Sequence, residues 1–252
     1  MDKFSLLSIV IPVYRQEKTI VDNVKNLEKA LDEINIKYEV IVVIDGLLDK
    51  ASEELRKIKN KNLRIYGYKN NQGKGYAVKY GMLKAKGDIV GFVDAGMDID
   101  LGGIRILLDY LKLHNADIVV GSKLHPDSEV VYPTQRKIMS WGYRTFTHLL
   151  FGFNIRDTQV GLKLFKRKVA RDVFIKLLVK QFSFDVETLA VAYLLGYKEI
   201  YEAPIKLKFN NNSSITSRSF WRIICHMLWD TIGIFYRLKI IKYYNNKDKE
   251  KI

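Results

Sequence analysis

The sequence predicts an α/β fold, with a mostly parallel sheet that carries helices on both faces. Apolar, β-branched runs alternate with amphipathic helical patterns through the first half of the chain. These runs are almost continuously apolar, as expected for strands that are buried on both faces of a sheet. The chain has 252 residues, enough for one substantial core, and 48% of them are hydrophobic. We therefore expect ligands to bind beyond the carboxyl ends of the strands.

Five runs are the predicted strands, and helical patterns separate them. The runs are LLSIVIPVY (6–14), YEVIVVID (38–45), LRIYGY (63–68), DIVGFVD (88–94) and ADIVVGS (116–122). The helical patterns span residues 19–34, 50–58, 76–86 and 104–114. Asp45 and Asp94 end two of the strands, so we expect the cleft to lie beside these two carboxylates.

The chain is strongly basic, with a formal net charge of +14 and a pI near 9.6. This surplus favours a phosphorylated or polyanionic partner, or an anionic membrane surface. No nucleic-acid reader motif accompanies it, so we do not expect nucleic acid as a partner. Cys225 is the single cysteine, which excludes an internal disulfide and is typical of a reducing cytosol. The apolar start of the chain runs into Pro12 without a cleavage site, so no signal peptide is expected.

The glycine-rich stretch NNQGKGYAVKYG (70–81) is neither a P-loop nor a dinucleotide fingerprint. Gly73 and Gly75 would let the backbone approach a ligand closely, and Lys74 could meet a phosphate at the start of the following helix. The alternative is an ordinary turn with a solvated lysine.

Four motifs in order carry a resemblance to a known family: SIVIPVYRQEKTI (8–20), YEVIVVIDG (38–46), NQGKGYAVKYGMLKAKGDIVGFVDA (71–95) and DTQVGLKLFKR (157–167). Together they resemble the inverting nucleotide-sugar transferases of glycosyltransferase family two, most of all the dolichyl-phosphate glucose and mannose synthases. The resemblance runs from about Ser8 to about Leu207. It implies a Rossmann-like GT-A domain, expected over residues 1–212, that binds a nucleoside diphosphate sugar with Mg²⁺ or Mn²⁺.

The resemblance also implies the donor-binding residues. It places the base and ribose near Pro12, Tyr14, Glu17 and Asp45, and the rest of the nucleotide sugar near Gly73, Lys74, Asp94 and Ala95. The family usually has glutamate where this chain has Gln16, and paired aspartates where it has Ile44 and Asp45. Because both departures fall on base-reading positions, the choice between UDP and GDP stays open. Asp45 has a second interpretation, as a turn residue before Gly46.

The expected metal ligands are Asp94 and Asp98. In the related synthases a second aspartate occupies the position of Gly96, and another polar residue follows where this chain has Asp98. Mg²⁺ manages with one or two carboxylates when a diphosphate supplies further oxygens, so Gly96 does not exclude a metal. Asp100, directly before LGGIRILLDY (101–110), is expected to be a helix N-cap.

A polyprenyl phosphate is the acceptor that the resemblance implies. It is already ionised near neutral pH, so its oxygen needs positioning by cations rather than a general base. The expected acceptor-phosphate and sugar residues are Lys123, Arg136, Asp157, Thr158, Lys163 and Glu187, and Asp94, Lys123 and Arg136 are the expected catalytic residues. Asp157 and Thr158 would brace their loop. Glu187 has a second interpretation, as a complement to a helix dipole, with Asp185 as the helix cap.

Two segments are expected to contact a membrane surface: the helical pattern at 135–151 and the aromatic, cationic segment at 213–245. Charged residues interrupt the second segment, so it is expected to lie in the interface rather than to span it. The alternative is that it packs on the domain or on another subunit of a homo-oligomer. Residues 246–252 are expected to be a disordered tail. The expected location is the cytoplasmic face of a membrane.

Three functions are consistent with these residues. The first is an inverting transfer of a hexose from UDP- or GDP-hexose to a polyprenyl phosphate. The second is a family-two transfer to a hydroxyl of a saccharide or lipid-linked glycan, with Asp185 or Glu187 as the base. The third is a non-catalytic homologue that binds a nucleotide sugar.

Overall fold

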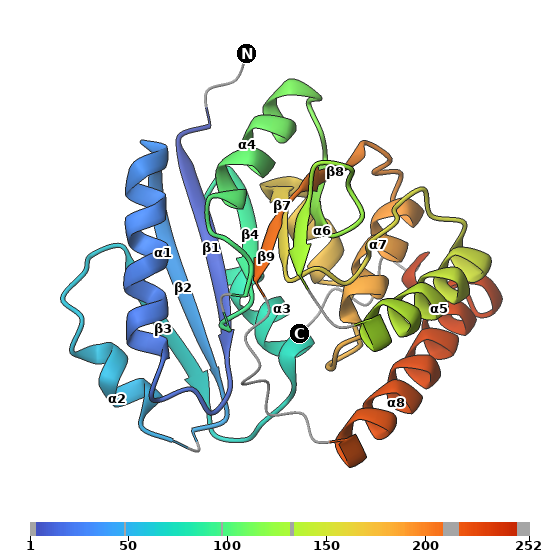
Figure 1. Ribbon diagram of the computed structural model, residues 1–252, viewed down its shortest axis with the longest axis horizontal. Coiled ribbons are helices and arrows are strands. Elements are labelled where there is room, and N and C mark those ends of the chain that lie inside the picture. The colour runs from blue at the N-terminus through green and yellow to red at the C-terminus, as the bar shows by residue number, and fades with distance from the viewer. Residues whose placement is uncertain (1–3, 48, 97, 132–133, 209–216, 246–252) are drawn as a thin grey trace.

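The computed structural model describes residues 4–47, 49–96, 98–131, 134–208 and 217–245, and it confirms the α/β fold (Figure 1). A mixed, mostly parallel seven-stranded sheet has the order β3-β2-β1-β4-β7-β5-β8. Its strands are β1 (Leu6–Val13), β2 (Lys37–Asp45), β3 (Leu63–Tyr68), β4 (Ile89–Val93), β5 (Ile118–Ser122), β7 (Leu162–Lys166) and β8 (Ile200–Pro204). The strand order reverses between β1 and β4, and this is the place where such sheets open a crevice for ligands.

The five predicted strands correspond to β1 through β5, whereas β7 was not predicted. It lies inside the sheet and runs antiparallel to both β4 and β5. Its sequence LKLFK carries two lysines in five residues, so it lacks the apolar run that marks the other strands. A second, two-stranded sheet pairs β6 (Glu129–Val131) with β9 (Lys206–Lys208).

The four predicted helices are present with ends shifted by at most two residues. They are α1 (Ile20–Ile34), α2 (Ala51–Arg56), α3 (Lys74–Lys84) and α4 (Gly103–Leu113). The other helices are α5 (Thr134–Phe151), α6 (Arg167–Phe174), α7 (Phe184–Leu194) and α8 (Ser217–Phe235), followed by the π-helix η1 (Tyr236–Ile240) and the 3₁₀-helix η2 (Tyr243–Asn245). In α1 the buried Ile20, Val24, Leu27 and Leu31 recur at helical spacing, which explains why this segment packs on the sheet.

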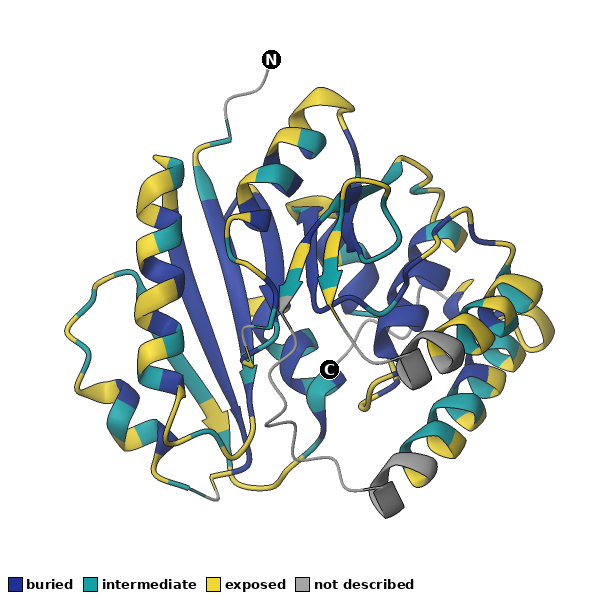
Figure 2. Ribbon diagram, in the orientation of Figure 1, coloured by how far each residue is buried: buried dark blue, intermediate teal, exposed yellow. Residues whose placement is uncertain are grey.

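Helices cover both faces of the sheet, and each face has its own core. Successive strand residues alternate between the two, so Ile9 packs with α1, α2 and α4, and Val10 packs with α3, α6 and α7. The central strands are accordingly buried along nearly their whole length (Figure 2). This burial explains why their sequences are almost continuously apolar.

The helices α5 and α8 lie side by side at one end of the molecule (Figure 1). The hydroxyls of Tyr143 and Thr231 join them at 2.7 Å. Their outer surface leaves large apolar side chains in solvent: Trp141 is 60% exposed, Leu149 78% and Trp229 75%. Within the ranges that the structure describes, no helix is both long enough and apolar enough to cross a membrane. The predicted disordered tail at 246–252 lies outside those ranges.

The close contact of β4 with β7 yields a stability prediction. A Cβ added at Gly91 would lie 2.3 Å from Leu164 Cδ2 and 2.6 Å from the backbone oxygen of Lys163. We expect Gly91→Ala to lower the free energy of unfolding by about 1–3 kcal/mol, because the overpacked strand must shift. Urea denaturation measures this change.

Gly142→Ala is the matched control, since nothing lies within 4 Å of a Cβ at this exposed position in α5. Its free energy of unfolding should stay the same or rise by up to about 1 kcal/mol through helix propensity. Equal effects of the two substitutions would contradict the packing of β7 against β4.

Candidate active site

A cavity of about 460 Å³ lies at the carboxyl ends of β1, β2 and β4. It brings together most of the residues that the sequence assigned to a nucleotide sugar: Pro12, Tyr14, Asp45, Gly73, Lys74, Asp94 and Ala95, with Asp98 beside them. Gln181 and Phe182, which sequence reasoning did not identify, also line it, as does Gln16, which stands at a position where the family usually has glutamate. We call this space the main cavity.

Glu17 does not line the main cavity, and Gln16 does. The Glu17 carboxylate accepts a hydrogen bond from the backbone N–H of Lys50 at 3.0 Å, while its own N–H donates to Asp49. Glu17 therefore fastens the loop after β2 to the loop after β1. The Gln16 Oε1 atom is buried and accepts no hydrogen bond from the described residues. Of the two side chains, Gln16 is thus the one placed to read a ligand, at the position where the family usually has glutamate.

Asp45 holds the glycine-rich loop in place. Its carboxylate is buried and accepts hydrogen bonds from the Asn71 side chain at 2.7 Å and from the backbone N–H groups of Gln72 and Gly73 at 2.6 and 2.8 Å. Several N–H donors offset the cost of burying a carboxylate. The Asp45 carboxylate therefore binds mainly to the glycine-rich loop, and it also lines the main cavity.

The glycine-rich loop fits tightly against residues 179–181. Gly73 has a φ of +104°, and a Cβ there would lie 2.4 Å from the carbonyl oxygen of Lys180. A Cβ at Gly75 would lie 2.7 Å from the carbonyl oxygen of Val179. The two glycines thus serve a backbone-to-backbone contact within the protein, and this contact places Gln181 at the main cavity.

Lys74 and Asp94 form the charged centre of the main cavity. Lys74 is the first residue of α3, and its Nζ atom lies 2.7 Å from Asp94 Oδ1. Burial opposes the charge of Lys74, but the carboxylates of Asp94 and Asp185 outweigh it and raise its pKa. The ammonium therefore stays charged and can stabilise an anionic group at the helix N-terminus.

Gly161 fixes the position of Asp94. A Cβ at Gly161 would lie 2.1 Å from the Asp94 carboxyl carbon, so no other residue fits there without displacing this carboxylate. The backbone N–H of Asp94 also donates to the carbonyl oxygen of Gly161 at 3.0 Å. The DTQVGLK motif thus has glycine at position 161 because the Asp94 carboxylate packs against its Cα atom.

A second, smaller cavity of about 140 Å³ lies on the other side of Asp94 and Asp98. Lys123, from the end of β5, lines it. The Lys123 ammonium forms an ion pair with Asp157 at 3.0 Å, and the backbone N–H of Lys123 donates to the same carboxylate. Asp157 therefore braces this loop. Asp94 and Asp98 line both cavities and so form the wall between them.

Lys163, which the sequence places at the acceptor phosphate, lines neither cavity. It is fully buried in β7, where its ammonium binds the Asp185 carboxylate and the carbonyl oxygen of Val160. Burial lowers the pKa of Lys163 and raises that of Asp185, and the attraction within the pair partly offsets both shifts. Asp185 is not the cap of α7 either, because the N-cap residue is Ser183.

Glu187 is fully buried and anchors the loop that faces the glycines, so it contacts neither cavity. Its carboxylate accepts hydrogen bonds from the backbone N–H groups of Leu178 and Val179 at 3.0 and 2.8 Å. The Tyr244 hydroxyl donates to its other oxygen, and Arg237 lies 3.7 Å away. The C-terminal segment is thereby joined to the wall of the main cavity. The contacts of Glu187 thus match neither of the two interpretations from the sequence, a sugar contact or a complement to the helix dipole.

The structure places the three remaining predicted residues, Asp100, Arg136 and Thr158, as follows. Asp100 is not the N-cap of α4, because α4 begins at Gly103 and its N-cap residue is Gly102. The Asp100 carboxylate instead accepts the N–H of Gly102 at 2.9 Å, in the turn directly before the helix. Arg136 lies in α5, but its side chain is outside the described part of the structure. Thr158 is buried next to Asp157 and lines neither cavity.

The residues at Asp94 fit a divalent cation that a ligand helps to hold. The Asp94 Oδ1 atom is buried, and the Lys74 ammonium lies 2.7 Å from it. Asp98 lines both cavities beside it. Among the residues that the structure describes, no cluster of three acidic, histidine or cysteine side chains could hold a metal alone. Phosphate oxygens would have to complete the coordination.

Comparison with known proteins gives consistent matches. The family described as Glycosyl transferase family 2 matches residues 8–174. The dolichyl-phosphate beta-glucosyltransferase of Homo sapiens is 31% identical over 254 residues, which is 93% of this chain and 76% of that protein. The protein of the same name from Dictyostelium discoideum is 32% identical over 205 residues, which is 75% of this chain. The alignment spans 63% of the length of the Dictyostelium relative.

Solved structures share the fold at low sequence identity. Glucosyl-3-phosphoglycerate synthase from Mycobacterium tuberculosis, in complex with Mn²⁺, UDP and phosphoglyceric acid, superposes with a TM-score of 0.69 at 16% identity, over 92% of this chain and 78% of that one. Mannosyl-3-phosphoglycerate synthase from Rubrobacter xylanophilus gives a TM-score of 0.71 at 13% identity, over 92% and 74%. At these identities the comparison establishes the fold alone.

The Glu187 anchor gives a prediction for pH dependence. Burial raises the pKa of Glu187, although the groups that donate to it partly offset this shift. Between its ordinary and raised pKa, the unfolded chain has released the proton and the folded chain has not. The contribution of Glu187 to the free energy of unfolding is therefore present at low pH and is lost as pH rises through the raised pKa.

We expect Glu187→Gln to be destabilised most at acidic pH and to approach the wild type as pH rises. Urea denaturation across this pH range measures the difference. Glu187→Ala should lose about 3 kcal/mol or more at all pH values, because it leaves buried donors without an acceptor. A wild-type-minus-Gln difference that does not change with pH would contradict the raised pKa.

Proposed function

We propose that the chain, which belongs to glycosyltransferase family 2, transfers a hexose from a nucleoside diphosphate sugar to a polyprenyl phosphate such as dolichyl phosphate. The arrangement around Asp94 carries this proposal: a cavity with Lys74 lies on one side of it, and a smaller cavity with Lys123 on the other. UDP-glucose is the first donor to test, because relatives of about 30% identity are named dolichyl-phosphate glucosyltransferases and UDP is bound in the related solved structure.

The main cavity supplies donor binding. Pro12, Tyr14 and Gln16 surround the end that would take the base and ribose, and the glycine-rich loop with Lys74 would take the diphosphate. Asp94, with Asp98 beside it, would hold Mg²⁺ or Mn²⁺. When bound there, the ion would neutralise charge on the diphosphate. Lys74 would also neutralise charge on the diphosphate, because its ammonium already lies at the N-terminus of α3.

The smaller cavity supplies the acceptor side. An ionised phosphate oxygen would attack the anomeric carbon while the bond from that carbon to the diphosphate oxygen breaks, and the nucleoside diphosphate leaves with the electron pair. No proton has to be removed, so the cations at this side need only hold the phosphate. Lys123 is the described candidate, and Arg136 is proposed to join it from α5. Asp185 and Glu187, the candidates for a general base on a hydroxyl acceptor, are buried away from both cavities.

Membrane contact would bring the lipid acceptor to this site. We propose that the outer surface of α5 and α8, together with η1, lies on the membrane interface. Trp229, Ile232, Tyr236 and Ile240 are exposed on it, and Arg237 and Lys239 lie in the same segment. Exposed aromatic rings with nearby cations are typical of interfacial helices. The opposite side of α8 packs on α5 and α7, so the segment combines packing and exposure.

A transfer assay tests the function. The full chain is incubated with radiolabelled UDP-glucose, Mg²⁺ and dolichyl phosphate, and label in the lipid phase is the expected result. Asp94→Asn should abolish transfer without loss of folding.

Lys123→Ala should raise the KM for dolichyl phosphate about tenfold or more, because a charge-assisted contact is lost, and should change the KM for UDP-glucose little. Lys29→Ala, an exposed lysine on α1, is the control.

Three outcomes of this assay would argue against the proposal. Label on a hydroxyl acceptor would favour transfer to a saccharide. Binding of nucleotide sugars by thermal shift, without turnover of any common UDP- or GDP-hexose, would favour a non-catalytic homologue. An equal effect of Lys123→Ala on both KM values would remove Lys123 from the acceptor side.

The membrane proposal predicts a separate loss of vesicle binding. We expect the double substitution Trp229→Ala and Ile240→Ala to weaken co-sedimentation with neutral phosphatidylcholine vesicles about tenfold or more, since two apolar side chains leave the interface. Leu113→Ala is the control, because Leu113 is exposed on α4 outside the proposed surface. Unchanged binding of the double variant would place the membrane contact elsewhere.

A further inference from the structure

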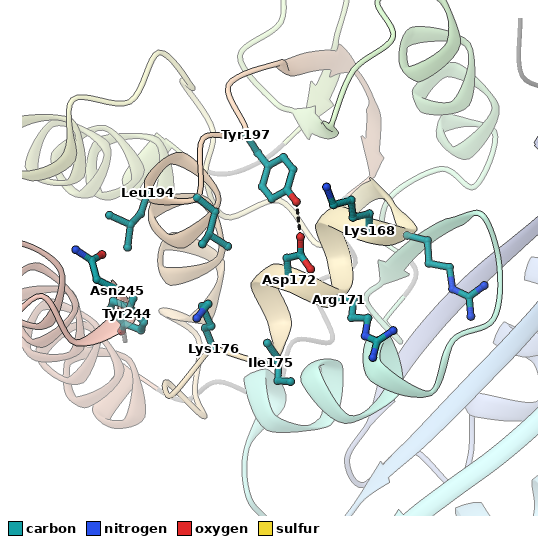
Figure 3. Close-up of a pocket in the computed structure, with 11 residues that line it drawn as sticks. Lys168, Arg171, Asp172, Ile175, Lys176, Leu194, Tyr197, Tyr244 and Asn245 are labelled. Atoms are coloured by element: carbon teal, nitrogen blue, oxygen red, sulfur yellow. Dashed lines mark hydrogen bonds between the residues drawn. The ribbon is translucent and has the colours of Figure 1, made fainter. Parts of the chain in front are cut away.

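A third hollow, larger than either cavity of the active site, lies between α6, the end of α7 and the C-terminal residues Tyr244 and Asn245 (Figure 3). Its volume is about 1020 Å³. We call it the α6 basin. It shares no lining residue with the two cavities of the candidate active site, and nothing in the proposed transfer uses it.

The α6 basin is strongly cationic on one side. Arg167, Lys168, Arg171 and Lys176 line it, and Asp172 is the one acid among the described residues of its lining. Three of them, Lys168, Arg171 and Lys176, form no ion pair with any carboxylate that the structure describes. Like charges gathered around one hollow create a positive potential that attracts an anion.

Asp172 already has a hydrogen-bond partner. The Tyr197 hydroxyl donates a hydrogen bond to Asp172, and Figure 3 shows Lys168 beside this pair. Burial and the Asp172 carboxylate raise the pKa of Tyr197 to about 12, so its hydroxyl keeps its proton at neutral pH. Asp172 is thereby turned toward Tyr197, which leaves the cations with little internal competition for an incoming anion.

The other side of the basin is apolar or aromatic. Leu194 and Leu195, at the end of α7, are 38% and 36% exposed and line this side. Tyr244 forms part of the wall, and its hydroxyl donates to Glu187. A hollow with cations on one wall and leucines on the other matches the junction of a phosphate headgroup and an acyl chain.

We infer that the α6 basin binds the phosphate of an amphiphilic anion, and we assign it to the headgroup of an anionic phospholipid. Arginine and lysine side chains together suit a phosphate, because arginine supplies paired donors and lysine a point charge. The basin borders the C-terminal segment that carries the proposed membrane surface, so a lipid bound here would hold that segment against the membrane. This site goes beyond the proposed transfer, and it can be tested without measuring transfer.

The experiment compares two double variants that lose the same charge. The double variant Lys168→Ala and Arg171→Ala removes two cationic side chains from the basin. The control variant Lys25→Ala and Lys29→Ala removes two exposed lysines from α1, on the opposite face of the sheet. Co-sedimentation is measured with vesicles of phosphatidylcholine alone and of phosphatidylcholine mixed with phosphatidylglycerol. We expect the basin variant to bind the mixed vesicles about tenfold more weakly than wild type, and the α1 variant to change much less. Binding to phosphatidylcholine alone should be the same for all three proteins.

A second measurement separates a lipid from a soluble phosphate. Thermal shift with glycerol 3-phosphate is recorded for the same proteins, all of which keep Lys74, so binding in the main cavity is common to them. Loss of vesicle binding in the basin variant alone supports the lipid headgroup. Loss of the thermal shift alone overturns the lipid assignment in favour of a soluble phosphate. Equal behaviour of the two double variants in both measurements overturns the site, because net charge would then account for all binding.

Discussion

Two buried carboxylates, Asp45 and Glu187, hold the loops of the candidate active site in place by accepting hydrogen bonds from backbone N–H groups. A carboxylate that leaves water must find donors, and here the donors lie in the loops that form the main cavity. Asp45 takes N–H groups from the glycine-rich loop, and Glu187 takes them from the loop that faces it. The two loops then meet at Gly73 and Gly75, where no Cβ fits. Weakening either carboxylate would release a wall of the cavity.

Asp94 occupies the centre of this arrangement because three constraints meet at it. β4 delivers it to the sheet edge, Gly161 leaves room for its carboxylate, and Lys74 supplies the opposite charge. Its carboxylate is therefore fixed before any ligand arrives, which favours electrostatic stabilisation without reorganisation. The cavities on its two sides can then present donor and acceptor to each other across one side chain. In the proposed transfer the acceptor phosphate is already ionised, so the site has to position the two substrates and needs no general base.

The sequence located most of the donor side, because those residues follow apolar runs or belong to a glycine motif. It misjudged side chains whose environment depends on distant segments. The sequence placed Lys163 at the acceptor phosphate, but β7 inserts between β4 and β5 and buries this side chain against Asp185. Glu187 looked like a helix-end acid, yet its partners include Tyr244, from the far end of the chain. No spacing rule connects residues that meet only through tertiary packing.

By itself the sequence determined the fold class, the family and the strand ends that carry Asp45 and Asp94, because these features follow from local apolar periodicity and motifs. The tertiary structure alone decided that Gln16 rather than Glu17 lines the cavity, that a loop at 178–182 completes it, and that α6 and the chain end enclose a separate cationic basin. The physical reason is the same in each case. Periodicity reports which side of an element is buried, whereas the partner that buries it is chosen by the packing of elements far apart in the chain.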